Sequence, residues 1–262
     1  MKLKNISIAN KLTLGFGVLI IIFILASTLA YRTLNQNIQN VQEISNVHNP
    51  SVDRIDELRN LIAESKLLIK NWVFIEKKSG TTDKQKLVNL HDKTYPDLKN
   101  KINALTNHWN NSEKALYDSI KTSIEDTLFT QHKQIMEQLS SFSSYDDPQV
   151  VFEIMPMVEQ GGKTIEITEN ILADLQKLAD QQKAKAESAR EVMNSSLSSF
   201  KTYIVFISIA LIIIGAITAF LIITGITKPV SQTIAFAEKI SCGDLNATIN
   251  IEREDEMGRL IR

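Results

Sequence analysis

The sequence contains a single cysteine, Cys242, among its 262 residues, which excludes a disulfide within the chain. Histidine is also scarce, and no pair of His or Cys residues has the spacing of metal ligands. The four histidines are His48, His91, His108 and His132. We expect them to be partly exposed residues on separate helices, and we predict no metal site.

Catalytic patterns are missing as well. The sequence has no glycine-rich loop that would cradle a phosphate, and no serine or cysteine nucleophile in a recognisable catalytic context. We therefore predict no enzymatic activity within these residues and no cofactor.

Charge is absent from two long segments of the chain. Residues 12–31 contain no charged residue in 20 positions, and residues 202–227 contain none in 26. A helix needs about 20 predominantly apolar residues to cross a bilayer. We predict transmembrane helices at 12–31 and 202–225, with the lipid bilayer as a partner.

The region between these segments lacks a strong excess of either charge. Residues 33–200 hold 19 Lys and Arg against 24 Asp and Glu, which does not favour nucleic acid as a partner. The first eleven residues contain no acid and three lysines, Lys2, Lys4 and Lys11. Basic residues beside a span resist translocation, so residues 1–11 are predicted to be cytoplasmic. Two spans then place residues 32–201 outside the cytoplasmic membrane and both termini inside it.

A cleaved signal peptide is the alternative interpretation of the first apolar segment. Lysines precede it, and small residues such as Ala26 and Ala30 lie near its end. However, the apolar run exceeds the roughly 7 to 15 residues of a signal core. Helical spacing also continues past it through Leu34 and Ile38. These features favour an uncleaved anchor.

Helical periodicity follows the first apolar segment. Apolar residues recur in alternating steps of four and three, the spacing of a helix that packs along a seam with partner helices. Eight aliphatic residues lie on this seam: Leu34, Ile38, Val41, Val52, Ile55, Ile62, Ile69 and Val73. Proline, glycine and cap-type residues predict helices at about 33–77, 83–107, 112–144 and from 148 to the second span.

These helices predict an all-α protein, a membrane-anchored up-down-up-down four-helix bundle with no β-strand. The first helix should be interrupted near Pro50, because proline removes a backbone donor. Pro156 and the Gly161-Gly162 pair should bend the fourth helix early. With no disulfide in the bundle, about 170 residues must be stable through packing alone, which is feasible at this size.

A more specific pattern follows the second span. A Thr-Lys-Pro-Val sequence at 227–230 begins a stripe of Val230, Ile234, Ala237 and Ile240. Gly-Asp-Leu at 243–245 and Asp-Glu-Met-Gly at 255–258 come next. In this order and spacing the region 226–262 resembles a HAMP domain that stops in its second helix. The whole arrangement resembles methyl-accepting chemotaxis proteins and some sensor histidine kinases with a four-helix-bundle ligand domain.

The resemblance assigns signal-relay roles to seven positions: Pro229, Gly243, Asp244, Leu245, Asp255, Glu256 and Gly258. Proline in a first helical turn weakens continuity with the helix above it, and Gly243 can end that helix in a left-handed conformation. One chain cannot bury the 226–240 stripe, so we expect a homodimer through the bundle and HAMP helices. The missing remainder of HAMP leads us to expect a fragment or truncated product without its output module.

The ligand site has no motif that the resemblance can transfer. Aromatic and basic residues near the end of the first bundle helix suggest a pocket for a small anion, with core packing as the alternative role. The candidates are Trp72, Lys77, Lys78 and Trp109, with Phe74, Tyr95 and Lys70 nearby.

The resemblance implies a receptor of the bacterial inner membrane that senses a small molecule or a periplasmic protein and relays the signal through HAMP, as a chemotaxis transducer does. Two alternatives remain open at this point. The chain could be the input half of a sensor histidine kinase, or a membrane-tethered scaffold without output.

Overall fold

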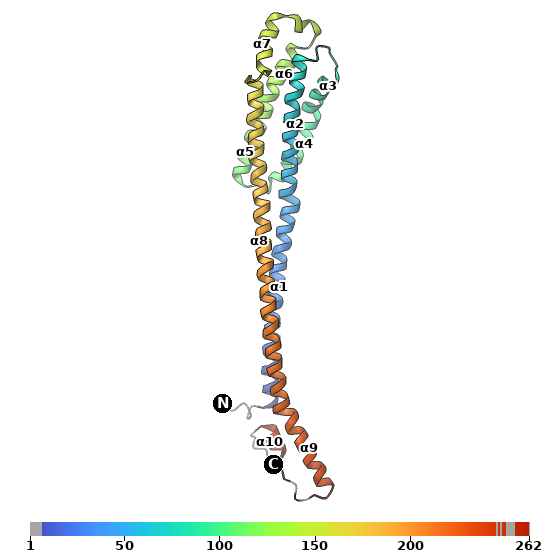
Figure 1. Ribbon diagram of the computed structural model, residues 1–262, viewed down its shortest axis with the longest axis vertical. Coiled ribbons are helices and arrows are strands. Elements are labelled where there is room, and N and C mark those ends of the chain that lie inside the picture. Colours follow the sequence, from blue (N-terminus) through green and yellow to red (C-terminus); the bar gives the residue numbers. More distant parts are fainter. Residues whose placement is uncertain (1–6, 245, 247, 250–254, 262) are drawn as a thin grey trace. The chain divides into compact units, whose positions relative to one another are not determined.

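A computed structural model describes residues 7–244, 246, 248–249 and 255–261, and Figure 1 shows its helices. The described residues contain no strand, so the predicted all-α class is confirmed. The chain divides into two compact units, residues 39–192 and the remaining residues at both ends. The first unit is the helical bundle, and the second contains the two apolar segments.

Four helical arms, connected end to end, build the bundle (Figure 1). The first arm is the end of α1 (Ile8–Glu43), η2 (Ile44–His48) and α2 (Asn49–Phe74). The second is α3 (Thr82–Asn89), η3 (Leu90–Thr94) and α4 (Tyr95–Thr106), and the third is α5 (Asn111–Thr122), η4 (Ser123–Leu128) and α6 (Phe129–Gln138). The 3₁₀ turn η5 (Phe142–Asp146), α7 (Pro148–Val158) and the start of α8 (Lys163–Ile222) complete it.

The bundle is held by one apolar core to which every arm contributes. Fully buried side chains include Ile62 of α2, Ile102 of α4, Ile135 of α6 and Leu175 of α8. Burying a side chain of this size stabilises the fold by roughly 1.5–3 kcal/mol. Packing therefore replaces the disulfides that the sequence lacks.

Wide π-helical turns precede three of the five prolines. Asn49 before Pro50, Tyr95 before Pro96 and Lys228 before Pro229 each donate a hydrogen bond to the carbonyl five residues back. A proline ring clashes with the carbonyl four residues before it, and a widened turn relieves this clash without ending the helix. The first arm is thus altered near Pro50, as predicted, but it is not broken.

Two helix boundaries differ from the predictions. The third arm ends at Gln138 instead of near 144, because the backbone leaves the helical conformation at Leu139, with φ of −99° and ψ of 44°, and is extended at Ser141. The fourth arm is not merely bent by Pro156 and the glycine pair. It is divided into α7 and α8, with residues 159–162 between them.

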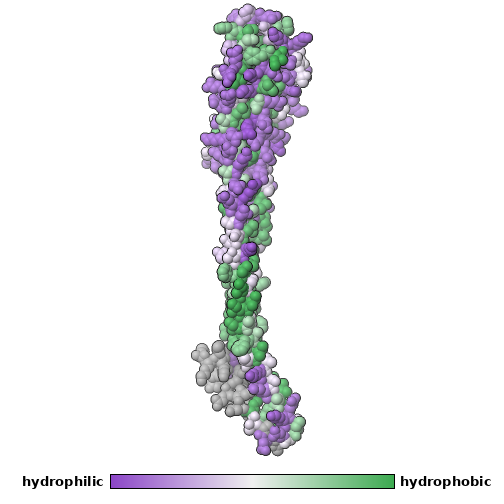
Figure 2. Space-filling model, in the orientation of Figure 1, coloured by the Kyte–Doolittle hydropathy of each residue, from purple (hydrophilic) through white to green (hydrophobic). Residues whose placement is uncertain are grey.

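The second unit contains the uncharged segments within α1 and α8. Both helices are long and apolar enough to cross a membrane. Their hydrophobic side chains cover the surface of this part of the chain in Figure 2. The helices approach closely at Gly15, where an added Cβ would lie 2.6 Å from Thr218 Cγ2. Small residues permit this kind of contact between membrane helices.

The chain continues from α8 through η6 (Ile223–Thr227) into α9 (Lys228–Ser241), and Gly243, two residues beyond this helix, has a φ of +92°. The N–H of Asp244 bonds to the carbonyl of Lys239, and the N–H of Gly243 bonds to that of Ile240. These two bonds form a Schellman motif, which satisfies carbonyls at the helix end. The short helix α10 (Glu256–Ile261) follows.

Candidate functional site

A cavity of about 590 Å³ lies where α2, α3 and α6 meet in the bundle. Its lining residues are Trp72, Ser79, Gly80, Lys84, Gln85, Val88, Asn89, Asp92, Met136 and Ser140. We call it the Trp72 cavity. Its volume falls in the range of about 300–1,000 Å³ that is typical of small-molecule sites.

Lys84 is the distinctive residue of this cavity, because only 5% of it is exposed. Its Nζ donates a hydrogen bond to Tyr145 Oη at 3.0 Å. It also lies 4.7 Å from the centre of the Trp72 ring and 5.1 Å from that of Tyr145. Burial lowers the pKa of Lys84, and Glu76 partly opposes this effect. The cavity therefore contains a cation that is held mainly by aromatic rings and one neutral hydroxyl.

The two aromatic side chains are themselves fixed by the backbone. Tyr145 Oη donates to the carbonyl of Trp72 at 2.7 Å, and Trp72 Nε1 donates to the carbonyl of Leu139 at 3.3 Å. Burial, followed by the charge of Glu76, raises the pKa of Tyr145 to about 12. The phenol is therefore neutral at pH 7 and cannot serve as a counter-ion for Lys84.

The structure brings only one of the four predicted ligand-site residues into this cavity. Trp72 lines it, whereas Lys77 and Lys78 are exposed in the α2–α3 loop and do not line it. Trp109 lies in the α4–α5 loop, where its Nε1 donates to Ser51 Oγ at 2.9 Å. Ser51 and Trp72 are 21 residues apart on one helix, or about 30 Å. The two tryptophans therefore do not share a site.

Lys84 and Tyr145 were missed by the sequence reasoning. Val88 and Asp92 follow Lys84 at steps of four, so they lie on the same helix face and also line the cavity. That stripe could have been found in the sequence. Tyr145 lies 61 residues beyond Lys84, so their contact depends on how the arms pack.

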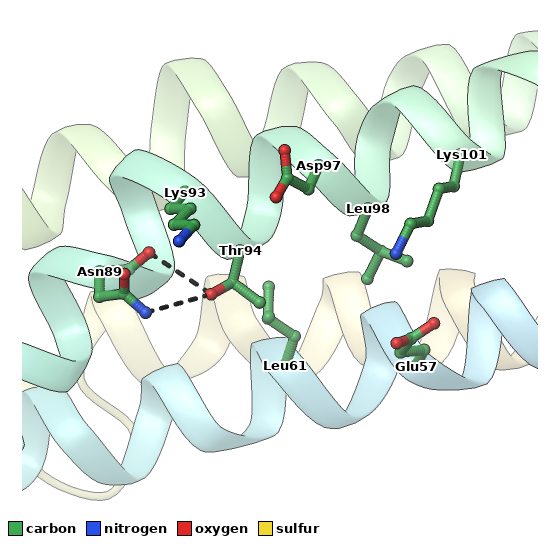
Figure 3. A pocket seen from close by; sticks show the side chains of 8 residues that line it. All are labelled: Glu57, Leu61, Asn89, Lys93, Thr94, Asp97, Leu98 and Lys101. Carbon is green, nitrogen blue, oxygen red and sulfur yellow. Dashed lines mark hydrogen bonds between the residues drawn. The ribbon is translucent and has the colours of Figure 1, made fainter.

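A second, smaller hollow of about 220 Å³ lies between α2 and the η3–α4 segment (Figure 3). Glu57 and Leu61 line it from α2, and Asn89 bonds with Thr94 at its edge. Its other lining residues are Lys93, Asp97, Leu98 and Lys101. All its charged side chains are exposed, and they include both signs. It lacks the buried charge of the Trp72 cavity, which we therefore prefer as the ligand site.

Three histidines are buried, which contradicts the expectation of partly exposed side chains. His48 is 5% exposed and its Nδ1 lies 3.1 Å from Gln182 Oε1. His91 and His132 are 8% and 0% exposed, and their Nε2 and Nδ1 atoms are 3.1 Å apart. Each buried ring shares a hydrogen bond with another buried polar side chain, which makes burial tolerable. No group of three or more metal-binding side chains occurs within the described part of the chain.

The predicted relay residues lie in the second unit. Pro229 is buried in the first turn of α9, and Gly243 and Asp244 form its C-terminal motif. Leu245 lies outside the described residues. The remaining three residues, Asp255, Glu256 and Gly258, lie at the start of α10.

Asp255 and Glu256 contact the beginning of α1. Lys11 Nζ lies 2.9 Å from Asp255 Oδ2, and the backbone N–H of Ile8 donates to Glu256 Oε2 at 2.9 Å. The hydrogen bond from Ile8 lowers the pKa of Glu256. Asp255 Oδ1 also accepts from the N–H of Gly258, as an N-cap does. The two acidic residues thus link α10 with the N-terminal end of the first apolar helix.

The described chain is a four-helix bundle whose helices α1 and α8 continue into two apolar segments. Residues 5–197 match the family described as "Four helix bundle sensory module for signal transduction". The chain belongs to this family. Its resemblance to methyl-accepting chemotaxis proteins is thereby confirmed.

Similar proteins include three chemotaxis proteins. Methyl-accepting chemotaxis protein McpQ of Pseudomonas putida is 27% identical over 104 residues, 40% of this chain and 14% of that protein. McpA of Bacillus subtilis is 49% identical over 51 residues, 20% of this chain and 8% of McpA. A probable methyl-accepting chemotaxis protein of Bacillus thuringiensis subsp. konkukian is 35% identical over 72 residues, 28% of this chain and 11% of that protein. The matches thus span a small part of each relative, and no solved structure matches significantly.

Proposed function

We propose that this chain is the input part of a chemotaxis-type transmembrane receptor. Residues 12–31 and 202–225 would cross the bacterial inner membrane, residues 32–201 would sense a stimulus outside it, and both termini would be cytoplasmic. Three methyl-accepting chemotaxis relatives favour this output over that of a histidine kinase.

The continuity of α8 carries this proposal. One helix, Lys163–Ile222, contains the core residues Ile171, Leu175 and Leu178 and most of the second uncharged segment. A displacement of the bundle end of this helix would therefore be transmitted along it. Shifts of about 1–2 Å are typical of helix movements in switching proteins.

The relay would be a HAMP domain of two copies of the protein, and residues 226–262 would supply its first helix, its connector and the start of its second helix. Its support is the order of Pro229, the Schellman end at Gly243, and the N-cap at Asp255. Contacts of Asp255 and Glu256 with Lys11 and Ile8 would let the relay respond to the first span as well as the second.

Topology is testable with two cysteines in intact bacterial cells. Cys242 is exposed, and Lys78 is exposed in the α2–α3 loop. A Lys78→Cys variant that also carries Cys242→Ser should react with a membrane-impermeant maleimide from outside the cytoplasmic membrane. The unmodified chain should react at Cys242 only after the membrane is permeabilised. The reverse pattern would disprove the proposed orientation.

Signalling is testable in a chimera. Residues 1–262 would be joined, in HAMP register, to the cytoplasmic remainder of Bacillus subtilis McpA. Stimulus-dependent methylation or swimming bias would support the proposal. A chimera that inserts in the membrane and dimerises, but never responds to any extract or compound, would favour a scaffold.

A further inference from the structure

We propose that the Trp72 cavity binds a small monocarboxylate with an apolar body, whose carboxylate pairs with the ammonium of Lys84. The binding claim stands on the cavity alone. The claim that this compound is the stimulus rests on the proposed function.

Lys84 supplies the reason for an anion. Within the described residues its Nζ has no carboxylate within 4 Å, and its one hydrogen-bond acceptor there is the neutral Tyr145 hydroxyl. An ammonium has three donors, and burying it with no carboxylate in direct contact is costly, although the more distant charge of Glu76 reduces this cost. The Trp72 and Tyr145 rings stabilise the cation through cation–π contacts but do not neutralise its charge. A carboxylate in the cavity would supply both the missing charge and further hydrogen-bond acceptors.

The apolar body follows from the other walls. Trp72, Val88 and Met136 line the cavity from three different helices. Burial of hydrocarbon against them would favour binding, because it removes apolar surface from water. A highly polar di- or tricarboxylate would leave this surface unused and would bring more charges than Lys84 can pair.

The position of the one acidic lining residue argues against α-amino acids. Asp92 is eight residues after Lys84, so about 12 Å of helix separates the two positions. The Lys84 ammonium is held at Tyr145 Oη and the two aromatic rings, so an α-amino acid, whose ammonium and carboxylate share one carbon atom, would have to span from there to Asp92. A monocarboxylate carries no ammonium, so it requires only the pairing with Lys84 and no contact with Asp92.

Hexanoate and benzoate are suitable probes for isothermal titration calorimetry on the full chain in mild detergent. Both should bind saturably, whereas hexanol, hexylamine and alanine should bind about tenfold more weakly or not at all. The protein has two tryptophans. A Trp109→Phe variant would therefore leave Trp72 as the only reporter, and its fluorescence should change along the same binding curve.

Three variants locate the site. Lys84→Met should weaken hexanoate binding about tenfold or more, because it retains the length of the side chain and removes the charge. Val88→Trp should block the cavity from α3 without touching Lys84. Lys77→Met is the matched control, since Lys77 is exposed and outside the cavity, and it should bind hexanoate within about twofold of the unmodified chain.

The possible outcomes separate the two claims. Unchanged hexanoate affinity in a folded Lys84→Met variant, equal affinity for hexanol, or no saturable binding up to about 10 mM would overturn the ligand assignment. Binding that meets these criteria without any response of the McpA chimera would support the site and count against its role as the receptor input.

Discussion

His91 and His132 form a buried pair between the second and third arms of the bundle. His91 also stacks on Phe129, with ring centres 3.9 Å apart. Burial lowers the pKa of His91 to about 4, and burial together with the neighbouring His91 lowers that of His132 to about 3. Asp92 and Lys133 act on His91 in opposite directions and more weakly. Both rings are therefore neutral in the folded bundle at pH 7.

This pair predicts acid sensitivity. Below pH 6.5 the two histidines bind protons in the unfolded chain but not in the folded bundle. The folded state therefore loses stability as the pH falls towards the folded pKa values, about 4 for His91 and about 3 for His132. The expected loss is up to about 1.4 kcal/mol per pH unit for each histidine. Urea unfolding of the full chain in mild detergent at pH 7, 6 and 5 would measure it.

The double variant His91→Phe and His132→Leu should flatten this pH dependence between pH 7 and 5. His108→Gln is the matched control, because His108 is exposed, and it should retain the dependence. An equally steep loss in the double variant would show that other groups cause the acid sensitivity.

Glu113 is a buried carboxylate at the start of the third arm. It accepts the backbone N–H of Asn110 in a capping box and lies 2.7 Å from Lys185 Nζ of α8. Glu113 is only 2% exposed, so loss of the cation would leave its charge poorly solvated. Lys185→Met should therefore lower the free energy of unfolding by about 1.5–3 kcal/mol.

Lys183→Met provides the comparison for this prediction. Lys183 lies two residues before Lys185 on α8. Half of its side chain is exposed, and its Nζ is 3.8 Å from Asp56 Oδ2. Surface pairs of this kind contribute about 0–1 kcal/mol. Chemical unfolding followed by circular dichroism would distinguish the variants, and equal effects would contradict a special role for the Glu113 pair.

The elements themselves were largely predictable from the sequence, because periodicity and helix breakers act locally. The second arm was predicted at 83–107 and spans Thr82–Thr106. The prediction of which residues lie on the buried seam of the first arm was less accurate. Ile55, Ile62 and Ile69 are buried, whereas Leu34 and Ile38 are exposed within the single chain. A π turn inserts an extra residue into the helix, so the buried face changes at η2.

The candidate site was less predictable than the arms because it depends on packing between them. Trp72 and Trp109 were both placed in an aromatic and basic pocket near the end of the first bundle helix, but they lie by successive loops, which are at opposite ends of an up-down bundle. The burial of His91 and His132 could not be predicted for the same reason, because it too depends on how the arms pack. Each histidine looks polar by itself, and only the packed arms show that the two rings bond to each other.

Gly243 gives a prediction for the end of α9. Its φ of +92° is unfavourable for any residue with a Cβ, at a cost of roughly 1–2 kcal/mol. Gly243→Ala should therefore fray the last turn of α9 and speed amide exchange there by about 5- to 30-fold, as measured by hydrogen–deuterium exchange. Gly225→Ala is the control. Gly225 is helical and an added Cβ meets nothing within 4 Å, so exchange in α9 should not increase.

At the scale of the whole molecule, the C-terminal part of the apolar stripe of α9 is exposed among the described residues of one chain. Ile234 is 55% exposed and Ile240 is 37% exposed. Ala237 lies between them on the same stripe and is also exposed. A heptad-like stripe of this kind is stabilised when a second helix covers it. Two copies of the chain, paired through α9, would do so and would give the relay the symmetry that a homodimeric receptor requires.

This pairing predicts a specific pattern of disulfide cross-links. In a Cys242→Ser background, Ala237→Cys should form a disulfide-linked dimer in membranes on mild oxidation, because the two Cβ atoms would face each other across the pair. Glu238→Cys, one residue further along, would point away from the partner and should cross-link far less. Non-reducing electrophoresis would show a band at twice the chain mass of 29.5 kDa for the first variant only. Equal cross-linking at both positions would indicate random collision, and none at either would place the α9 helices apart.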